Sequence, residues 1–347
     1  MSEKLHVGGQ AVIEGVMMKS PSFYAISLRK NNKSIKKQLN AFTSIRPRKR
    51  LNMIGCTSIS TKSNIFKIPF IRGMINFGEM LYIGVKSLMY SAEEAELEEE
   101  KTEVREQRSE DTKEDNKKPK TIPKSVLYST LFFSFLLAIF IFVVIPTASL
   151  EIFIRETEHP IMFSLFRGLI KLVIFFVYLI SISFLKDIRR VFQYHGAEHK
   201  IINVFEKKKE LTIENAIAEK TFHPRCGTSF LFFVIIVSIF MYLFVVAFYN
   251  HYEFFGINAL FTDMQLRIIQ KTVLILTNIM LLPIIASIAY ELIRLSFRLQ
   301  KFKVFGIFLL PGMLFQRLTA REPSRDMLEV SLASLRMVLD AENGKSR

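Results

Sequence analysis

The chain has 347 residues, of which half are hydrophobic, 33 are Phe and none is Trp, and its mean hydropathy is positive. This composition excludes an ordinary soluble domain and predicts helices that span a membrane. The formal net charge of +15 is explained by basic segments beside the anionic headgroups of a lipid bilayer. Because no recognition motif accompanies the charge, we expect no nucleic-acid partner.

Residues 1–92 form a first predicted unit, a small cytoplasmic α+β domain. Its start, residues 6–18, is an extended segment punctuated by glycines. Residues 23–29 and 34–45 favour two strands around a turn at Asn31-Asn32, because Asn tolerates a positive φ.

An apolar stretch at residues 65–90 carries Arg72, Glu79 and Lys86 at steps of seven residues. This spacing gives a single polar stripe, which predicts an amphipathic helix in the membrane interface or packed on a helical bundle. Residues 93–124 are almost entirely charged or small and bury little apolar surface. They are interpreted as a helix extension that frays into a flexible linker.

Four apolar runs have the length of about 20 residues that a hydrocarbon core of roughly 30 Å requires. Arg167 and Lys171 are the charges near the start of the second run, and they would snorkel or face the bundle. The predicted fold is therefore a mainly α membrane protein whose residues 125–296 form a bundle of four transmembrane helices. The four runs are residues 126–145, 161–185, 229–249 and 272–288.

The short loops predict the orientation of these helices. The loop at residues 186–228 is rich in Lys and Arg, as are the flanks of the first and fourth runs, whereas the first connection carries only Arg155 among three Glu. Under the positive-inside rule, this loop and both termini are cytoplasmic in a multi-pass protein of the cell membrane. Residues 1–19 lack a basic start followed by an apolar core, so we expect no signal peptide.

The C-terminal part, residues 297–347, contains two further elements. Residues 302–318 are apolar but are broken by Gly306 and Pro311-Gly312, which predicts an interfacial or re-entrant segment. Ser324 is expected to cap a final amphipathic helix over residues 325–341, with acidic residues in its first turns, where the helix dipole favours them.

The most informative motif is His195-Gly196-Ala197-Glu198-His199 in the basic loop. Two histidines four residues apart on a helix project from the same face, so both imidazoles can bind one metal ion. The order H-x-x-E-H is the inverted form of the zinc-protease signature, in which Glu198 would act as general base on a metal-bound water. The expected cofactor is a divalent metal, with zinc favoured.

A catalytic zinc usually has three protein ligands and a water. Candidates for the third ligand are His223, Cys226 and Glu14, and we favour His223 because it follows a short helix on the same side of the membrane. If Cys226 joined three histidines, the site would be closed and structural. Alternatively, Cys226 would be a nucleophile activated by a neighbouring histidine and by Arg225.

Four motifs in order resemble the YqhQ-like family of bacterial membrane proteins along nearly the whole chain. The resemblance implies a protein with several membrane spans, and it implies the metal-dependent enzyme activity that is predicted for the family. The motifs are Gly8-Gly9-Gln10-Ala11-Val12-Ile13-Glu14-Gly15-Val16-Met17-Met18, Tyr194-His195-Gly196-Ala197-Glu198-His199-Lys200, His223-Pro224-Arg225-Cys226-Gly227-Thr228-Ser229-Phe230, and Glu322-Pro323 ahead of Met327-Leu328-Glu329-Val330.

The resulting hypothesis is a membrane-embedded, metal-dependent hydrolase with its site at the cytoplasmic face. Glu198 would be the general base, and Arg225 would stabilise negative charge that develops on a carbonyl or phosphoryl oxygen. The substrate would be a membrane peptide or a lipid. The alternative is a non-catalytic scaffold or assembly factor with a membrane-protein partner, in which the same residues form a structural metal site or a metal-free polar cluster. A transporter is disfavoured because the runs lack carboxylates and show no inverted repeat.

Overall fold

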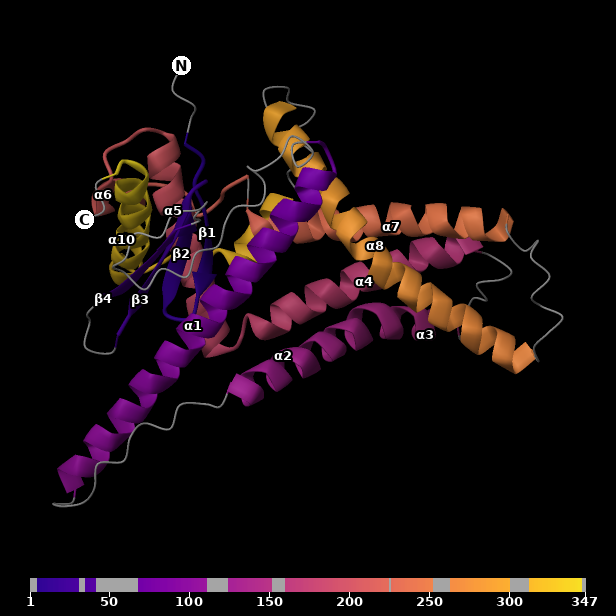
Figure 1. Ribbon diagram of the computed structural model, residues 1–347, viewed down its shortest axis with the longest axis horizontal. Coiled ribbons are helices and arrows are strands. Elements are labelled where there is room, and N and C mark those ends of the chain that lie inside the picture. The colour runs from indigo at the N-terminus through magenta and orange to yellow at the C-terminus, as the bar shows by residue number, and fades with distance from the viewer. Residues whose placement is uncertain are drawn as a thin grey trace.

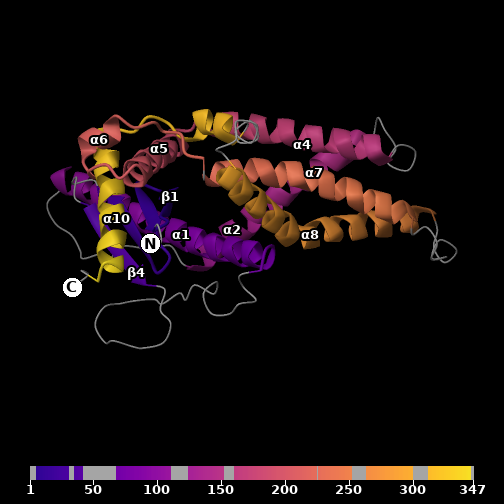
Figure 2. The same cartoon turned by 90° about the horizontal axis from the view of Figure 1, so that it is seen from above.

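The computed structural model describes residues 5–30, 35–41, 68–110, 124–151, 160–224, 226–251, 263–299 and 312–344. The fold is mainly helical, with a small antiparallel sheet near the N-terminus. The sheet and its covering helices lie at one end of the molecule, and the long apolar helices extend away from them (Figure 1). The view from above shows the same division (Figure 2).

The sheet is a meander of four antiparallel strands in the order β1-β2-β3-β4. Glu14, in the turn between β1 and β2, has a φ of 52°. The two predicted strands are present as β3 and β4, and the glycine-punctuated segment before them forms the hairpin of β1 and β2. The strands are β1 (Gly8–Val12), β2 (Gly15–Lys19), β3 (Phe23–Arg29) and β4 (Ile35–Ala41).

Both faces of the sheet are covered, because side chains alternate between the faces of a strand. On one face, Val16, Met18 and Ala25 pack against helix α5 (Lys186–Glu206) and helix α10 (Arg325–Glu342). On the opposite face, Met17, Tyr24 and Ile26 pack around Ile83 of helix α1 (Ile71–Glu110). The C-terminal helix therefore shares its core with the N-terminal strands, and we call this assembly the sheet unit.

Helix α1 confirms the predicted helix from residue 71 to residue 90 and continues to residue 110 as the predicted extension; residues 65–67 lie outside the described residues. Arg72 makes an ion pair with Glu291 of helix α8 (Asp263–Leu299), and Glu79 pairs with Lys19 of β2 at 2.9 Å. Two members of the polar stripe thus bind other elements of the protein. The helix packs on α8, which is the second of the two locations predicted for it.

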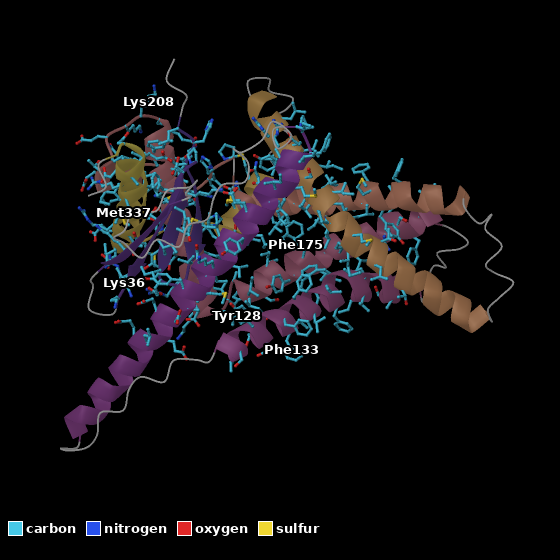
Figure 3. All side chains as sticks on the ribbon, in the orientation of Figure 1. Lys36, Tyr128, Phe133, Phe175, Lys208 and Met337 are labelled. Atoms are coloured by element: carbon cyan, nitrogen blue, oxygen red, sulfur yellow. The ribbon has the colours of Figure 1, made fainter. Side chains whose placement is uncertain are left out.

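Two helical stretches, Tyr128–Leu150 and Ile161–Ile182, are long and apolar enough to cross a membrane. The first consists of α2 (Lys124–Ile139), a π-helical turn (Phe140–Val144) and α3 (Ile145–Glu151), and the second lies in α4 (Pro160–Ile182). Tyr128 and Phe133 of α2 are 59% and 67% exposed and project from the helix (Figure 3). Within the part of the chain that the structure describes, the apolar stretch of helix α7 (Gly227–His251) is shorter, at Ser229–Phe244.

Aromatic contacts join the apolar helices α4 and α7 to the segment at residues 312–319. Residues 312–319 are helical, and Phe315 from this segment stacks on Phe176 of α4 with ring centroids 4.5 Å apart. Phe232 of α7 contacts the same ring. Residues 302–311 of the predicted interfacial or re-entrant segment lie outside the described residues. The described part packs Phe315 against α4 and α7.

Helix α10 begins and ends close to the predicted bounds. Ser324 occupies the N-cap position, as predicted. Its side chain makes no capping hydrogen bond, so the prediction that its hydroxyl caps the helix is wrong. The helix is stabilised instead by an apolar face that packs on the sheet, and Ser334 Oγ donates to the carbonyl of Ala25 at 2.9 Å. Burial of an amphipathic face outweighs the contribution of a single cap.

A buried carboxylate, that of Glu219, binds two lysines of the loop that follows α5. Glu219, whose side chain is 3% exposed, accepts hydrogen bonds from Lys207 at 2.5 Å and Lys209 at 2.7 Å. Burial by itself would raise the pKa of Glu219, but the two ammonium groups outweigh it and hold the pKa below the ordinary 4.5. A carboxylate with a lowered pKa stabilises the fold above its unfolded pKa, and this contribution is lost as the pH falls through the folded pKa.

Replacement of Glu219 by Gln is therefore expected to destabilise the protein at pH 7 by about 1–2 kcal/mol, because the two half-exposed lysines lose the negative charge and one of them meets an amide NH₂ in place of an acceptor oxygen. The difference from the native chain should shrink below pH 4.5, where the native carboxylate also becomes protonated. Thermal unfolding followed by circular dichroism in detergent measures both. Glu210→Gln, an exposed position in the same loop, is the control, and an equal loss in both variants would contradict the expectation.

Candidate metal centre

Helix α5 carries the H-x-x-E-H motif and confirms that this segment is helical. It does not continue helix α4, because the chain turns at residues 183–185 and Leu185 has an extended backbone. His195, Glu198 and His199 lie within little more than one turn of α5. The imidazole rings of the two histidines are 4.3 Å apart between centroids.

Backbone carbonyls orient both imidazoles. His195 Nδ1 lies 2.7 Å from the carbonyl oxygen of Thr319, and His199 Nδ1 lies 2.5 Å from that of Thr221. A carbonyl only accepts hydrogen bonds, so each Nδ1 carries the proton and each Nε2 keeps its lone pair. Metal-binding histidines are typically held in this way, with the second ring nitrogen bound to a carbonyl or carboxylate.

Cys226 supplies a third donor atom. Its Sγ lies 3.1 Å from His195 Nε2, and the donor atoms of Cys226, His195 and His199 all lie within 4.8 Å of one another. Sulfur and nitrogen ligands of one tetrahedral zinc ion are about 3.5 Å apart, which follows from their bond lengths. The thiol and His199 are almost fully buried, and the side chain of His195 is 13% exposed. These three residues fit a zinc ion with little movement.

Glu198 is buried next to these donors. One of its carboxylate oxygens lies 4.0 Å from His195 Nε2 and 3.8 Å from His199 Nε2. Burial raises the pKa of Glu198, while His195, His223 and a hydrogen bond from the backbone N–H of Gly9 oppose this shift. A Cβ atom at Gly9 would lie 2.7 Å from Glu198 Cγ, so a glycine is needed where β1 covers the carboxylate.

His223, the favoured third ligand, lies outside this group of donors. Gln316 clamps its backbone, because the Gln316 amide accepts from the His223 N–H at 2.8 Å and donates to the His223 carbonyl at 2.7 Å. Its Nε2 lies 3.3 Å from a carboxylate oxygen of Glu206 but without hydrogen-bond geometry. The His223 ring still contacts the His199 ring, with centroids 5.7 Å apart. Burial lowers the pKa of both histidines, which favours the neutral rings.

Glu14, the remaining predicted ligand, is engaged elsewhere. Its two oxygens accept from Nε and Nη2 of Arg190, each at 2.5 Å, and the Tyr194 hydroxyl lies 3.3 Å away. Burial raises the pKa of Tyr194, so the phenol stays protonated. Arg225, predicted to stabilise negative charge, lies outside the described residues.

Gly196, inside the motif, allows a second chain segment to approach α5. A Cβ atom at this position would lie 1.9 Å from the carbonyl oxygen of Arg321. The Arg321 N–H donates to the carbonyl of Phe192 at 2.9 Å, so the segment is bonded to the helix where the glycine leaves room. Lys200, the last residue of the same motif, is buried and makes an ion pair with Glu322, which joins the two segments a second time.

Three residues that support the site were absent from the predicted set. Thr221 and Thr319 act through backbone carbonyls, and no side-chain pattern identifies a carbonyl that will accept from an imidazole. Gln316 had a usable signal, because a polar residue within an otherwise apolar segment requires hydrogen-bond partners when it is buried. It is fully buried and also donates to Ser229 Oγ at 3.1 Å.

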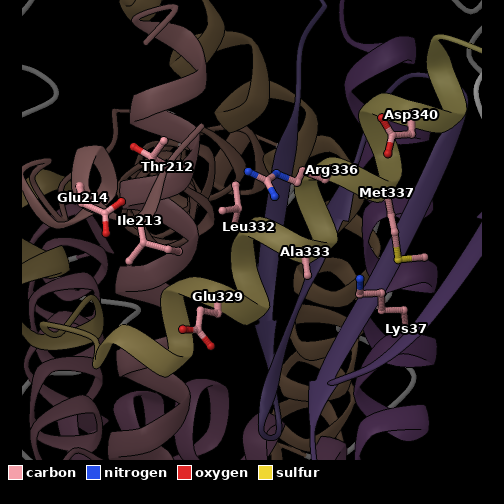
Figure 4. A pocket seen from close by; sticks show the side chains of 10 residues that line it. All are labelled: Lys37, Thr212, Ile213, Glu214, Glu329, Leu332, Ala333, Arg336, Met337 and Asp340. Carbon is pink, nitrogen blue, oxygen red and sulfur yellow. The ribbon is translucent and has the colours of Figure 1, made fainter. Parts of the chain in front are cut away.

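A pocket of about 540 Å³ lies elsewhere on the sheet unit, between α10, β4 and the start of α6 (Ile213–Ile217) (Figure 4). Its polar lining mixes both signs of charge and shares no residue with the histidine cluster. It contains neither His nor Cys, so it is not part of the candidate metal centre. The lining residues are Lys37, Thr212, Ile213, Glu214, Glu329, Leu332, Ala333, Arg336, Met337 and Asp340.

The sequence is similar to one protein family and to one curated protein. The family model described as "Protein of unknown function (DUF1385)" matches residues 68–341. The chain is also 32% identical over 343 residues to "Uncharacterized protein YqhQ" of Bacillus subtilis (strain 168), an alignment that covers 96% of this chain and 92% of that relative. No solved structure matches the chain. Neither description names an activity, so the function must be argued from the site.

Proposed function

The chain belongs to the family of proteins of unknown function DUF1385, and we propose that it is a multi-pass membrane protein with a metal-dependent hydrolase centre. The metal ligands in this proposal are His195, His199 and Cys226, and Glu198 is the general base. Cys226 replaces His223 as the preferred third ligand because its sulfur lies beside His195 Nε2.

The membrane part of the proposal has four spans, in α2 with α3, α4, α7 and α8. Two stretches that are long and apolar enough to cross a membrane support it, as do the lengths of α7 and α8, 25 and 37 residues. The excess of Lys and Arg in residues 186–228 supports a cytoplasmic location for the metal centre and for both termini.

Zinc is the proposed metal because two neutral imidazoles and a thiolate are its typical ligands. Three protein ligands leave one position open, which is the arrangement of catalytic zinc sites. When bound, the metal would supply Lewis acidity and lower the pKa of water at the open position. The observation that carries this part is the pair of Nε2 atoms directed to one point by two backbone carbonyls, with Cys226 Sγ beside them.

Glu198 is proposed as the general base because of its location beside the metal donors and because of its raised pKa. One carboxylate oxygen of Glu198 lies about equally far from Nε2 of His195 and Nε2 of His199. A carboxylate at this distance is too far away to be a ligand itself but can contact a water bound at the open position of the metal. Burial raises its pKa toward the operating pH, where a carboxylate is most effective as a general base. In this role Glu198 would accept the proton of the attacking water, with the Gly9 N–H holding one oxygen in place. The substrate would be a membrane peptide or a lipid, since Arg321, two residues after Thr319, donates to the carbonyl of Ser183 directly after the end of α4.

A structural site is the alternative, and one observation favours it. Four segments that are distant in the sequence meet at the cluster: β1, α5, residues 221–226 and residues 312–319. A metal there would hold the sheet unit to the helical region, as in a scaffold or assembly factor. The two functions differ in what they require of Glu198.

The test is the metal content of the full chain, purified in detergent without chelators, by mass spectrometry. We expect about one zinc per chain in the native protein, none in His199→Ala, and an unchanged amount in Glu198→Gln, because Glu198 lies outside the ligand set. Glu206→Gln is the matched control, since this carboxylate lies beside His223 and away from the donors.

Each outcome separates the candidates. Zinc that is retained in Glu198→Gln, together with hydrolysis of a peptide or lipid panel that falls by about 100-fold or more, supports the enzyme. Zinc that is retained with no hydrolysis by any form, and a thermal midpoint that drops on chelation, supports the structural site. Absence of zinc from the native chain, even after reconstitution with zinc or manganese, would overturn both.

A further inference from the structure

The turn between α4 and α5 exposes two apolar side chains at the end of a stretch that is long and apolar enough to cross a membrane. Helix α4 ends at Ile182, and α5 begins at Lys186. Phe184 and Leu185 in this turn are 78% and 57% exposed. Most of each side chain is therefore left uncovered by the described residues.

Basic side chains lie next to these apolar residues. Lys186 and Arg189 are exposed in the first turn of α5. Arg321 comes from a segment that is distant in the sequence, and its guanidinium donates to the carbonyl of Ser183 at 3.3 Å. Two segments of the chain therefore bring cations to the same turn.

Arg317 belongs to the second of these segments, which runs beside the last two turns of α4. Phe315 stacks on Phe176, and six residues later Arg321 reaches Ser183, so Arg317 lies along this stretch, where it is exposed. The apolar pair and the four cations form what we call the elbow surface: Phe184, Leu185, Lys186, Arg189, Arg317 and Arg321.

The acidic groups that lie next to the elbow surface in these two segments do not cancel its charge. Asp187 is a single carboxylate against four cations. Glu322, in the second segment, makes an ion pair with buried Lys200. The neighbouring cation Arg190 is likewise paired, with Glu14, and is not counted. The elbow surface is therefore positive.

This combination of side chains matches the surface of a bilayer that contains anionic lipids. Apolar side chains at the end of a span enter the acyl-chain region, while Lys and Arg bind the phosphates at the level of the headgroups. Inorganic phosphate would bind the cations but would leave Phe184 and Leu185 in water. A lipid satisfies both parts of the surface.

We infer that the elbow surface binds the headgroup of an anionic phospholipid in the leaflet at this end of α4. The bound headgroup lies beside the metal centre, because the Arg321 N–H donates to the Phe192 carbonyl and Thr319, two residues earlier, orients His195. Lipid binding at the elbow surface requires no metal, so it can be measured separately from the zinc content.

The test is a titration of the full chain in detergent with phosphatidylglycerol or phosphatidylcholine, in which native mass spectrometry counts the bound lipids. We expect phosphatidylglycerol to bind about tenfold more tightly or better. Arg189→Gln should weaken its binding about fivefold, and Arg189→Gln combined with Lys186→Gln about 25-fold, because each basic residue at an anionic surface contributes by a similar factor.

Lys208→Gln is the matched control, since Lys208 is exposed just beyond the opposite end of α5 (Figure 3). This variant should bind phosphatidylglycerol as the native chain does. Inorganic phosphate in about tenfold excess should displace no lipid, because it makes no apolar contact. Equal affinity for the two lipids, an equal loss in Lys208→Gln, or displacement by inorganic phosphate would overturn the inference.

A second measurement covers the case in which the charge variants do not fold. The chain contains no Trp, so Phe184→Trp and Ile217→Trp each introduce a single fluorophore. In vesicles of phosphatidylglycerol with brominated acyl chains, which quench Trp on contact, the fluorescence of Phe184→Trp should be quenched. Ile217 is 50% exposed on α6, in the sheet unit, and Ile217→Trp should keep its fluorescence. Equal fluorescence of the two variants in these vesicles would contradict insertion of the elbow surface into the leaflet.

Discussion

Alanine in place of Gly196 is expected to lower the thermal midpoint of the protein by about 10 °C and to abolish zinc binding. The new Cβ atom would lie 1.9 Å from the Arg321 carbonyl oxygen and 3.0 Å from its carbonyl carbon, which are backbone atoms and cannot rotate away. The segment must then leave α5, and its hydrogen bond to the Phe192 carbonyl breaks. Thr319, which orients His195, lies two residues earlier on the same segment, so the centre should be lost with it.

Gly78→Ala is the matched control, because it is also a glycine within a helix. Nothing lies within 4 Å of a Cβ atom at Gly78, so alanine there should stabilise α1 by up to about 1 kcal/mol through its higher helix propensity. Circular dichroism and zinc content measure both variants. If Gly196→Ala melted like the native chain and kept its zinc, the close approach of residues 320–322 to α5 would be refuted.

The second large effect concerns the identity of the third ligand. Cys226→Ala is expected to weaken zinc binding by more than 100-fold, since loss of a partner outside the ligand set already costs roughly 10- to 100-fold. His223→Ala should weaken it less, because the His223 side chain lies outside the group of three donors. Competition with a fluorescent zinc chelator measures both affinities at pH 7.

Cys226→His serves as the rescue variant, because an imidazole can replace a thiolate as a zinc ligand. It should recover part of the affinity that Cys226→Ala loses. The reverse ranking, in which His223→Ala loses zinc and Cys226→Ala keeps it, would reinstate His223 and leave Cys226 as a thiol beside His195. Circular dichroism of each variant excludes misfolding as the cause.

Local patterns were sufficient for several features of this protein. The helical spacing of His195 and His199 placed both imidazoles on one face of α5, because helix geometry fixes that relation whatever surrounds it. The strand predicted at residues 23–29 followed from a neighbouring turn, and the helix predicted at 65–90 and the C-terminal helix followed from amphipathicity. Each depends on residues that are close in the chain, so neighbouring side chains specify it.

The choice between His223 and Cys226 as the third donor beside His195 and His199, and the groups that orient the two histidines, depend on contacts between distant segments. His223 and Cys226 are three residues apart; the Gln316 amide holds the backbone of His223, and Cys226 Sγ lies 3.1 Å from His195 Nε2. Glu14 was a reasonable ligand by chemistry, but the hairpin turn that carries it places its carboxylate against Arg190.

The local pattern of hydropathy along the sequence predicted that the chain is mainly helical and contains apolar stretches of membrane-spanning length, because hydropathy and period are properties of short windows of sequence. The tertiary structure decided that α10 packs on the sheet of the N-terminal strands. It also decided that the Arg321 carbonyl approaches Gly196 and that the Gly9 N–H binds Glu198. Such contacts join residues that are far apart in the sequence: His195 and Thr319 are 124 positions apart, and Ala25 and Ser334 are 309 positions apart. They arise from the burial of complementary surfaces and the pairing of buried backbone groups, which no local pattern encodes.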